Sequence, residues 1–200
     1  MLRVGLTGGL ASGKSFVGRT LRGFGAHVID ADALGHQVLA PDGPAYDGVV
    51  AEFGPEIVNA SGEIERKKLG TLVFGNPERL AKLNALVHPH VIALEERYLV
   101  EAEQEDPGGI AVLEAAILIE TGSYKRFAKL ILVWCKPEQQ IARAVHRDGC
   151  TLEEARARVA RQMPLEDKRR FADFVIDTSG EKERTVIQTR LVYEALRRLL

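Results

Sequence analysis

Short apolar runs alternate with segments of helical spacing along much of the chain. Residues 2–7 have the length and apolar character of a buried strand, and apolar positions at helical spacing follow over residues 14–24. A second short run at 26–30 precedes a helical stretch over 32–39, which has to stop before Pro41. The start of the chain therefore predicts strand, helix, strand and helix in that order.

The middle of the chain, residues 41–105, has an almost entirely helical pattern. Helical spacing covers residues 45–53, 66–74 and 77–104, and Pro89 is expected to kink or break the last of these helices. We interpret residues 41–105 as an inserted helical subdomain, and residues 1–40 and 106–200 as the core that carries it.

Strands and helices alternate again after the turn sequence D-P-G-G at 106–109. The runs at 110–113 and 129–134 are too apolar for the edge of a sheet, and residues 174–177 form the fifth and last predicted strand. Five strands separated by helices indicate an α/β fold with a parallel sheet covered on both faces. Ligands are expected at the carboxyl ends of these strands.

Helices are also predicted after the fourth and fifth strands. Pro137 opens one that runs to about residue 147, and Thr151 with Glu154 forms a capping-box signature for the next. The closing helix, residues 181–200, is amphipathic. Its apolar face is predicted to consist of Val186, Ile187, Leu191, Ala195 and Leu199.

Composition excludes several classes of protein. The 200 residues are 46% hydrophobic, which suits one domain or one domain with an insertion, and 27 Lys and Arg against 28 Asp and Glu leave a net charge of −1. Such a balance gives no global field that favours nucleic acid or an anionic membrane. With no apolar stretch of membrane-spanning length and no leader pattern, a cytoplasmic location is expected. The composition does not indicate an oligomeric state.

The cysteines and histidines do not predict a metal site. Cys135 and Cys150 are the only cysteines, too few for a zinc pattern, and we interpret both as structural. The five histidines lack a metal-ligand spacing.

Residues 8–15, G-G-L-A-S-G-K-S, match the phosphate-binding loop pattern G-x-x-x-x-G-K-[ST] between a predicted strand and a predicted helix. The backbone N–H groups of such a loop, at a helix N-terminus, form an anion site. Lys14 is predicted to reach the β- and γ-phosphates of a nucleoside triphosphate, and the Ser15 hydroxyl to help hold Mg²⁺.

Two aspartates follow the second predicted strand. Phosphoryl transfer usually places a carboxylate beside the accepting hydroxyl, and we predict Asp32 as that base, with Asp30 as a possible support for Mg²⁺. Capping of the following helix is the alternative role for Asp32. Glu114 and Glu120 flank the apolar segment after the third strand, and their position does not decide which of them assists Mg²⁺.

Arginines supply the remaining candidate chemistry. Arg143 and Arg147 lie four residues apart on one predicted helix, so both face the same way and are predicted to bind phosphate oxygens from a lid at about 143–163. A solvated basic surface is the alternative interpretation.

Several motifs in register resemble those of the dephospho-coenzyme A kinase family. They are the phosphate-binding loop, V-I-D-A-D, G-E-I-E-R, H-P-H-V, Q-x-x-R-x-x-x-R-D-G, R-x-x-x-Q and A-D-F-V-I-D. The resemblance implies a P-loop kinase core with a helical CoA-side domain and a lid. It also implies transfer of the ATP γ-phosphoryl group to the ribose 3′-hydroxyl of dephospho-CoA, the last step of coenzyme A biosynthesis.

Residue by residue, Asp32 matches the family's proposed base, while Arg66, His88 and Pro89 match positions on its substrate side. The predicted catalytic set is Lys14, Asp32 and Arg143. The predicted ATP-binding set is Gly8, Gly9, Ala11, Ser12, Gly13, Lys14, Ser15, Phe16, Arg143 and Arg147. Two positions depart from the family pattern: Ala116 stands where proline is usual, and Thr178 stands where asparagine is common.

Other functions remain open at this point. The nearest is a related P-loop kinase that acts on a nucleoside monophosphate or a sugar acid. A regulatory nucleotide switch is less consistent with the sequence, because N-K-x-D is absent, and a structural protein with a degenerate loop is inconsistent with intact Lys14, Ser15 and Asp32.

Overall fold

The computed structural model describes residues 1–73 and 75–200, so Phe74, at the end of the predicted helix 66–74, lies outside the described residues. Two compact units make up the described chain. The sheet unit comprises Met1–Asp30 and Leu99–Leu200, and the helical unit comprises Ala31–Tyr98. Most of the helical unit coincides with the predicted insertion, residues 41–105.

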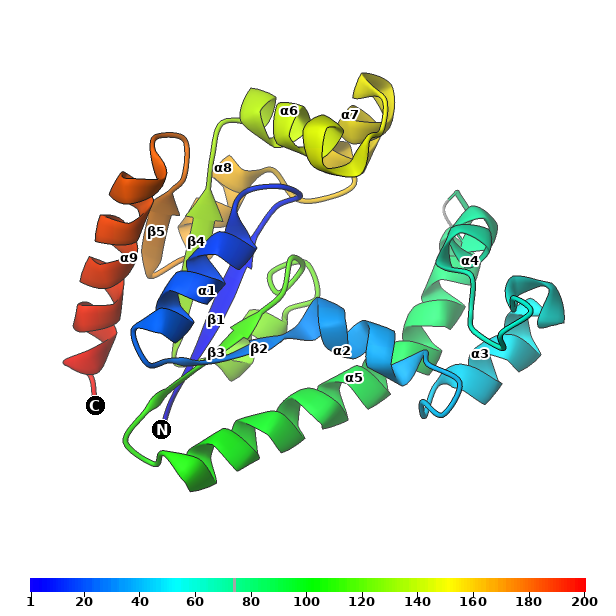
Figure 1. Ribbon diagram of the computed structural model, residues 1–200, viewed down its shortest axis with the longest axis horizontal. Coiled ribbons are helices and arrows are strands. Elements are labelled where there is room, and N and C mark those ends of the chain that lie inside the picture. The colour runs from blue at the N-terminus through cyan, green and yellow to red at the C-terminus, as the bar shows by residue number, and fades with distance from the viewer. Residues whose placement is uncertain (74) are drawn as a thin grey trace. The chain divides into compact units, whose positions relative to one another are not determined.

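A five-stranded parallel sheet forms the centre of the sheet unit, as the sequence predicts (Figure 1). Its strand order is β2-β3-β1-β4-β5, so the two most apolar runs, β3 and β4, lie inside the sheet. The strands are β1 Leu2–Gly8, β2 His27–Asp30, β3 Ile110–Glu114, β4 Lys129–Trp134 and β5 Phe174–Asp177.

Helices pack on both faces of this sheet. Val17 and Leu21 of α1 and Leu196 of α9 are buried against one face, and Leu165 of α8 packs on Leu132 of the other. Strand alternation explains this, because successive side chains of each strand point to opposite faces. The helices of this unit are α1 Lys14–Gly23, α6 Pro137–Asp148, α7 Leu152–Ala160, α8 Leu165–Lys168 and α9 Lys182–Arg197. Two short 3-10 helices lie in its connections: η2 Ser123–Arg126 between β3 and β4, and η3 Arg169–Phe171 between α8 and β5.

The predicted apolar face of α9 is wrong. Ile187 and Leu191 are each 61% exposed, whereas Thr185 and Thr189 are buried together with Val192 and Leu196. A buried threonine is tolerated in a helix when its hydroxyl bonds to the carbonyl one turn earlier, and Thr189 Oγ1 donates to Thr185 O at 2.7 Å. The buried face of α9 therefore includes threonines, which a pattern of apolar residues alone does not reveal.

The helical unit has a core of its own, built around Val49, Phe53 and Ile57 with Leu69 and Val73. Its elements are α2 Ala31–Val38, α3 Tyr46–Phe53, η1 Pro55–Ile57, α4 Arg66–Val73 and most of α5 Pro77–Glu105, with the unit boundary after Tyr98.

Of the kink or break expected at Pro89, the break is wrong, because α5 is not interrupted there. The helix runs without interruption from Pro77 to Glu105, 29 residues in all. A proline inside a helix costs about 3 kcal/mol, through one lost hydrogen bond and a steric clash. Apolar side chains on both sides of Pro89, such as Leu86 and Val91, pack against the core of the helical unit and offset that cost.

Candidate active site

The phosphate-binding loop joins β1 to α1 at the carboxyl end of the central strand (Figure 1). Gly13 has a φ of 91° and precedes the first residue of α1, and a Cβ at this position would lie 3.3 Å from Thr178. Ala11 also adopts a positive φ, 53°, which costs a non-glycine residue about 1 kcal/mol or more. Such strain at a loop next to a helix N-terminus is typical of binding sites.

Several N–H groups of this loop are available to an anion. Among the hydrogen bonds of the described residues, the N–H groups of Ala11, Gly13 and Ser15 donate to no protein acceptor. The neighbouring N–H of Ser12, by contrast, donates to Gly9 O at 3.2 Å. The loop thus leaves donors near the N-terminus of α1, where the helix dipole favours negative charge.

Glu114, the last residue of β3, brings the side chains of Lys14 and Ser15 together. Its Oε1 accepts from Lys14 Nζ at 3.0 Å and from Ser15 Oγ at 2.7 Å. Glu114 and Lys14 are both buried, so this ion pair is shielded from water. A Cβ at Gly18 would collide with Glu114 Oε2, so the absence of a side chain on α1 makes room for the carboxylate.

Of the two glutamates that the sequence left open, only Glu114 contacts the loop's Lys14 and Ser15 in the described hydrogen bonds. Glu120 Oε1 instead lies 2.9 Å from Lys168 Nζ and accepts from the N–H of Met163 at 3.1 Å. The sequence offered no means of separating them, because both acids come after the strand predicted at 110–113.

Asp30 and Asp32 fall on either side of the boundary between the two units. Asp30 ends β2 and is the register partner of Glu114 in β3. Both residues therefore stand at the carboxyl end of their strands, next to each other in the sheet. Asp32 is the second residue of α2. It therefore lies inside the first turn of the helix, whereas a capping residue stands immediately before the first helical residue.

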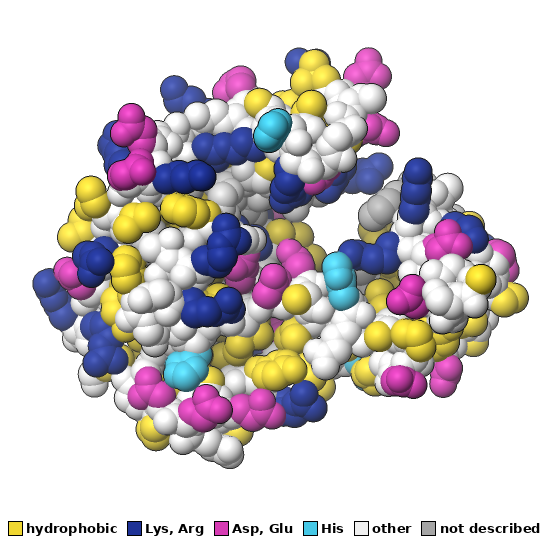
Figure 2. Space-filling view, in the orientation of Figure 1, with side chains coloured by type: hydrophobic (Ala, Val, Ile, Leu, Met, Phe, Trp, Pro, Cys, Tyr) yellow, Lys and Arg dark blue, Asp and Glu magenta, His cyan; other side chains and the backbone are white. Residues whose placement is uncertain are grey.

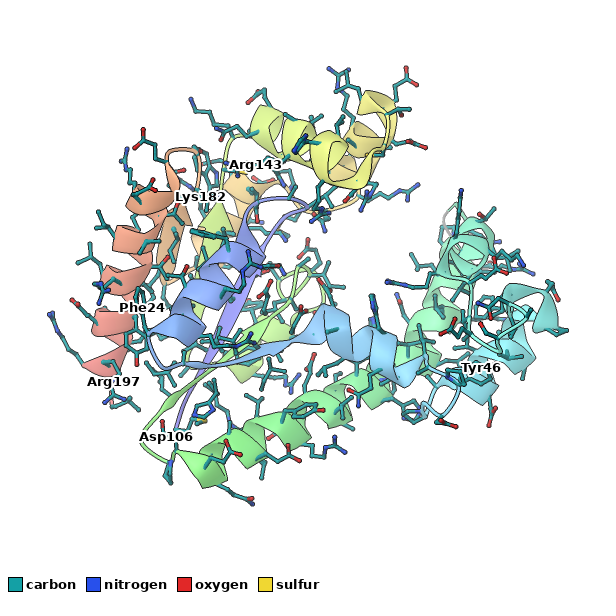
Figure 3. The ribbon with its side chains drawn as sticks, in the orientation of Figure 1. Phe24, Tyr46, Asp106, Arg143, Lys182 and Arg197 are labelled. Carbon is teal, nitrogen blue, oxygen red and sulfur yellow. The ribbon has the colours of Figure 1, made fainter. Side chains whose placement is uncertain are left out.

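Arg143 and Arg147 lie on α6 and have different described partners. Arg143 projects from α6 (Figure 3), and its guanidinium donates to Thr178 O at 2.6 Å and to Thr178 Oγ1 at 3.2 Å. Thr178 Oγ1 in turn donates to Ser12 O at 2.6 Å. The threonine that departs from the family pattern thus links Arg143 to the phosphate-binding loop.

Arg147 belongs to a surface cluster centred on Asp148. Asp148 accepts from Arg147 Nε at 2.7 Å and from Arg158 Nη1 at 2.5 Å. The hydrogen bond from Arg147, assisted by Arg158, outweighs desolvation and lowers the pKa of Asp148 to about 2. The same contact raises the pKa of Arg147.

The stabilising effect of this cluster is expected to disappear in acid. An aspartate in an unfolded chain has a pKa of about 3.9, so Asp148 stabilises the fold above that pH and loses the effect as pH falls through about 2. The difference in melting temperature between wild type and Asp148→Asn should therefore be constant above about pH 5 and shrink towards pH 2. Thermal unfolding at a series of pH values tests this, and an unchanged difference at pH 2 contradicts it.

Three long polar side chains contact the first half of the loop, and the sequence alone gives none of them a role. Lys168 is fully buried, and its Nζ donates to Gly8 O at 3.0 Å and to Ala116 O at 2.8 Å. Gln140 and Gln162 bond to the Leu10 backbone. Both glutamines lie in the motifs quoted above, whereas Lys168 stands in a charged stretch that looks like surface.

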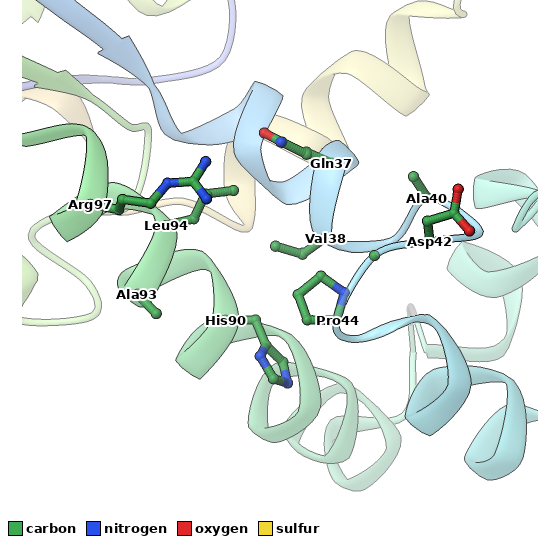
Figure 4. Close-up of a pocket in the computed structure, with 10 residues that line it drawn as sticks. Gln37, Val38, Ala40, Asp42, Pro44, His90, Ala93, Leu94 and Arg97 are labelled. Atoms are coloured by element: carbon green, nitrogen blue, oxygen red, sulfur yellow. The ribbon is translucent and has the colours of Figure 1, made fainter. Parts of the chain in front are cut away.

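In the helical unit, Arg66 bonds to His36, and a cavity of about 560 Å³ opens beside α5 (Figure 4). The cavity combines apolar and polar walls. Its lining includes Val38, Pro44, Leu94, Gln37 and Arg97.

The surface carries both signs of charge, which lie interspersed on the visible face (Figure 2). No helix within residues 1–73 and 75–200 has the length and apolar character required to span a bilayer. Over the same residues, no three His, Cys, Asp or Glu side chains cluster as a metal site.

Comparison with known families extends the resemblance seen in the motifs. The family model described as dephospho-CoA kinase matches residues 2–183. The chain belongs to the dephospho-CoA kinase family. This confirms the family predicted from the motifs and does not favour a kinase for a nucleoside monophosphate or a sugar acid.

Individual relatives agree with membership in the dephospho-CoA kinase family. A dephospho-CoA kinase from Syntrophus aciditrophicus is 42% identical over 196 residues, which span 98% of this chain and 83% of that protein. A crystal structure of a Thermus thermophilus protein has a TM-score of 0.83 at 34% identity, covering 98% of this chain and 97% of the other. Dephospho-CoA kinase from Campylobacter jejuni has a TM-score of 0.70 at 26% identity, with the same coverage.

Proposed function

We propose that this protein transfers the γ-phosphoryl group of ATP to the ribose 3′-hydroxyl of dephospho-CoA, the last step of coenzyme A biosynthesis. One observation carries the proposal: Lys14 and Ser15 converge on buried Glu114 at an intact phosphate-binding loop, in a chain that belongs to the dephospho-CoA kinase family. The substrates are therefore ATP and dephospho-CoA, and we propose a cytoplasmic protein without nucleic-acid or membrane partners.

The loop holds the triphosphate in this proposal. Its available N–H groups bind phosphate oxygens, and Lys14 leaves Glu114 to reach the β- and γ-phosphates as a mobile point charge. The residues proposed to surround ATP are Gly8, Gly9, Ala11, Ser12, Gly13, Lys14, Ser15, Phe16, Arg143 and Arg147.

Mg²⁺ fits the donor set beside this loop. The Ser15 hydroxyl and the Glu114 carboxylate are hard oxygen ligands, and Asp30 stands next to Glu114 in register. When bound, the ion would neutralise the negative charge of the phosphate oxygens. We propose Ser15 as a ligand, with Glu114 and Asp30 as supporting carboxylates.

Asp32 acts as the general base in this reaction. Its carboxylate takes the proton of the ribose 3′-hydroxyl as that oxygen bonds to the γ-phosphorus, while the bond from the γ-phosphorus to the bridging oxygen of ADP breaks. Arg143 and Arg147 stabilise the charge on the transferred group. Arg147 has to exchange its bond to Asp148 for a phosphate oxygen.

We assign the acceptor side to the helical unit. Its cavity offers both apolar and polar walls, as an extended, partly polar acceptor requires, and Arg66, His88 and Pro89 belong to this unit.

A panel of acceptors tests the proposed activity. Purified protein with Mg²⁺ and ATP should phosphorylate dephospho-CoA, with little turnover of AMP, adenosine or gluconate at equal concentration. Product analysis by mass spectrometry identifies the phosphorylated compound. If dephospho-CoA is no better an acceptor than the others, the proposed substrate is wrong.

A further inference from the structure

The peptide groups of Leu10, in the phosphate-binding loop, are held from both sides by glutamine side chains. Gln162 Oε1 accepts from Leu10 N at 2.7 Å, and Gln140 Nε2 donates to Leu10 O at 2.9 Å. The two amides are complementary to the two backbone groups, so each glutamine is required in one orientation.

These glutamines come from the two ends of one segment. Gln140 lies in the first part of α6, and Gln162 follows the end of α7 at Ala160. Figure 1 shows α6 and α7 next to the loop between β1 and α1. The segment that carries Arg143 and Arg147 is therefore tied to the loop at both of its ends.

The fit at Gln140 is close. Gln140 is only 4% exposed, and a Cβ at Gly9 would collide with its Nε2. Next to it, Lys168 Nζ fixes Gly8 O at 3.0 Å. Burial lowers the pKa of Lys168, and Glu120 counteracts that shift. Three buried or part-buried side chains thus determine the orientation of the loop's first peptide groups.

A glycine-rich loop needs such external contacts. Glycine permits many backbone conformations, so the peptide planes of G-G-L-A-S-G have no strong preference of their own. Binding of a triphosphate depends on N–H groups that already point at the phosphates. The bond from Leu10 N to Gln162 also removes this N–H from the phosphate site, so later N–H groups are left to bind the phosphates.

We propose that Gln140 and Gln162 are positioning residues that fix the Leu10 peptide groups, and that they thereby keep the phosphate-binding loop in register with the arginine-bearing α6–α7 segment. This rests on the proposed kinase function, because it concerns the nucleotide site of that reaction.

The same substitution at the two positions separates positioning from a charge effect. Glutamate at 162 still accepts from Leu10 N. At 140, a carboxylate has no N–H group to donate to Leu10 O, and its negative charge repels that carbonyl oxygen. Both variants add one negative charge near the same residue. We expect Gln140→Glu to weaken MgADP binding by about tenfold or more relative to Gln162→Glu, as loss of a buried hydrogen bond with an opposed charge predicts.

The readout is the dissociation constant of MgADP by calorimetry, with KM for both substrates and the melting temperature of each variant. Positioning predicts a change in MgADP affinity and in KM for ATP, while KM for dephospho-CoA stays within about twofold. Equal weakening by both glutamate variants, or weakening by neither, overturns the proposal. If the effect on MgADP tracks only a fall in melting temperature, it is overturned as well.

Leucine variants keep the test decisive if Gln140→Glu fails to fold. Gln140→Leu and Gln162→Leu each lose one bond to Leu10 without adding charge, and each should weaken MgADP binding by about threefold to tenfold. Wild-type affinity in both overturns the proposal. Because MgADP binding needs no acceptor, failure to phosphorylate dephospho-CoA would reject the proposed function and leave this test intact.

Discussion

Replacement of Asp32 by asparagine is expected to reduce kcat by about 10²–10⁴-fold, the usual contribution of a positioned general base. The amide keeps the size of the side chain and removes its ability to take the proton of the acceptor hydroxyl. The dissociation constant of MgADP should stay within about twofold, because Asp32 is proposed to act on the acceptor hydroxyl, and MgADP contains neither that hydroxyl nor the transferred phosphoryl group. Steady-state kinetics with dephospho-CoA and calorimetry with MgADP measure the two quantities.

Asp47→Asn is the matched control for this variant. Like Asp32, Asp47 is an exposed acid in the first turn of a helix, α3 of the same unit. Removal of a negative charge from a first turn costs typically 0.3–1 kcal/mol, so both variants should lose similar stability. If Asp32→Asn keeps turnover and shows only this small loss, its role is helix stabilisation, the alternative that the sequence left open.

The local parts of the fold could be predicted from sequence because each depends on neighbouring residues. Thr151 and Glu154 form both bonds of the predicted capping box at the start of α7. The runs at 129–134 and 174–177 coincide with β4 and β5. Strand length, apolar character and capping chemistry are properties of short segments, so no knowledge of the remaining chain is needed.

Contacts between distant segments could not be predicted in this way. Lys168 lies 160 positions from Gly8, and only the folded sheet unit brings its ammonium group to that carbonyl. The continuity of α5 through Pro89 likewise depends on packing against segments remote in sequence. The choice between Glu114 and Glu120 depended on which carboxylate faces Lys14, and that contact joins β3 and α1 across 100 positions of the chain.

A second large effect is expected at Glu114. Glu114→Gln removes the charge that pairs with buried Lys14, and breaking a buried pair by changing one partner costs about 3 kcal/mol, even though the amide keeps an acceptor oxygen. For a chain of this size that is a fall in melting temperature of about 6–12 °C. Because the carboxylate is also a proposed support for Mg²⁺, the Mg²⁺ concentration at half-maximal activity should rise about tenfold, equivalent to about 1.4 kcal/mol.

Glu120→Gln separates the two effects, because Glu120 pairs with the other buried lysine, Lys168. It should lower the melting temperature of the protein and leave its Mg²⁺ requirement unchanged. Saturating MgATP should restore more stability to Glu114→Gln than to Glu120→Gln, since the triphosphate replaces the missing partner of Lys14 but does not replace that of Lys168. Equal shifts in Mg²⁺ requirement for both variants would assign Glu114 a structural role only.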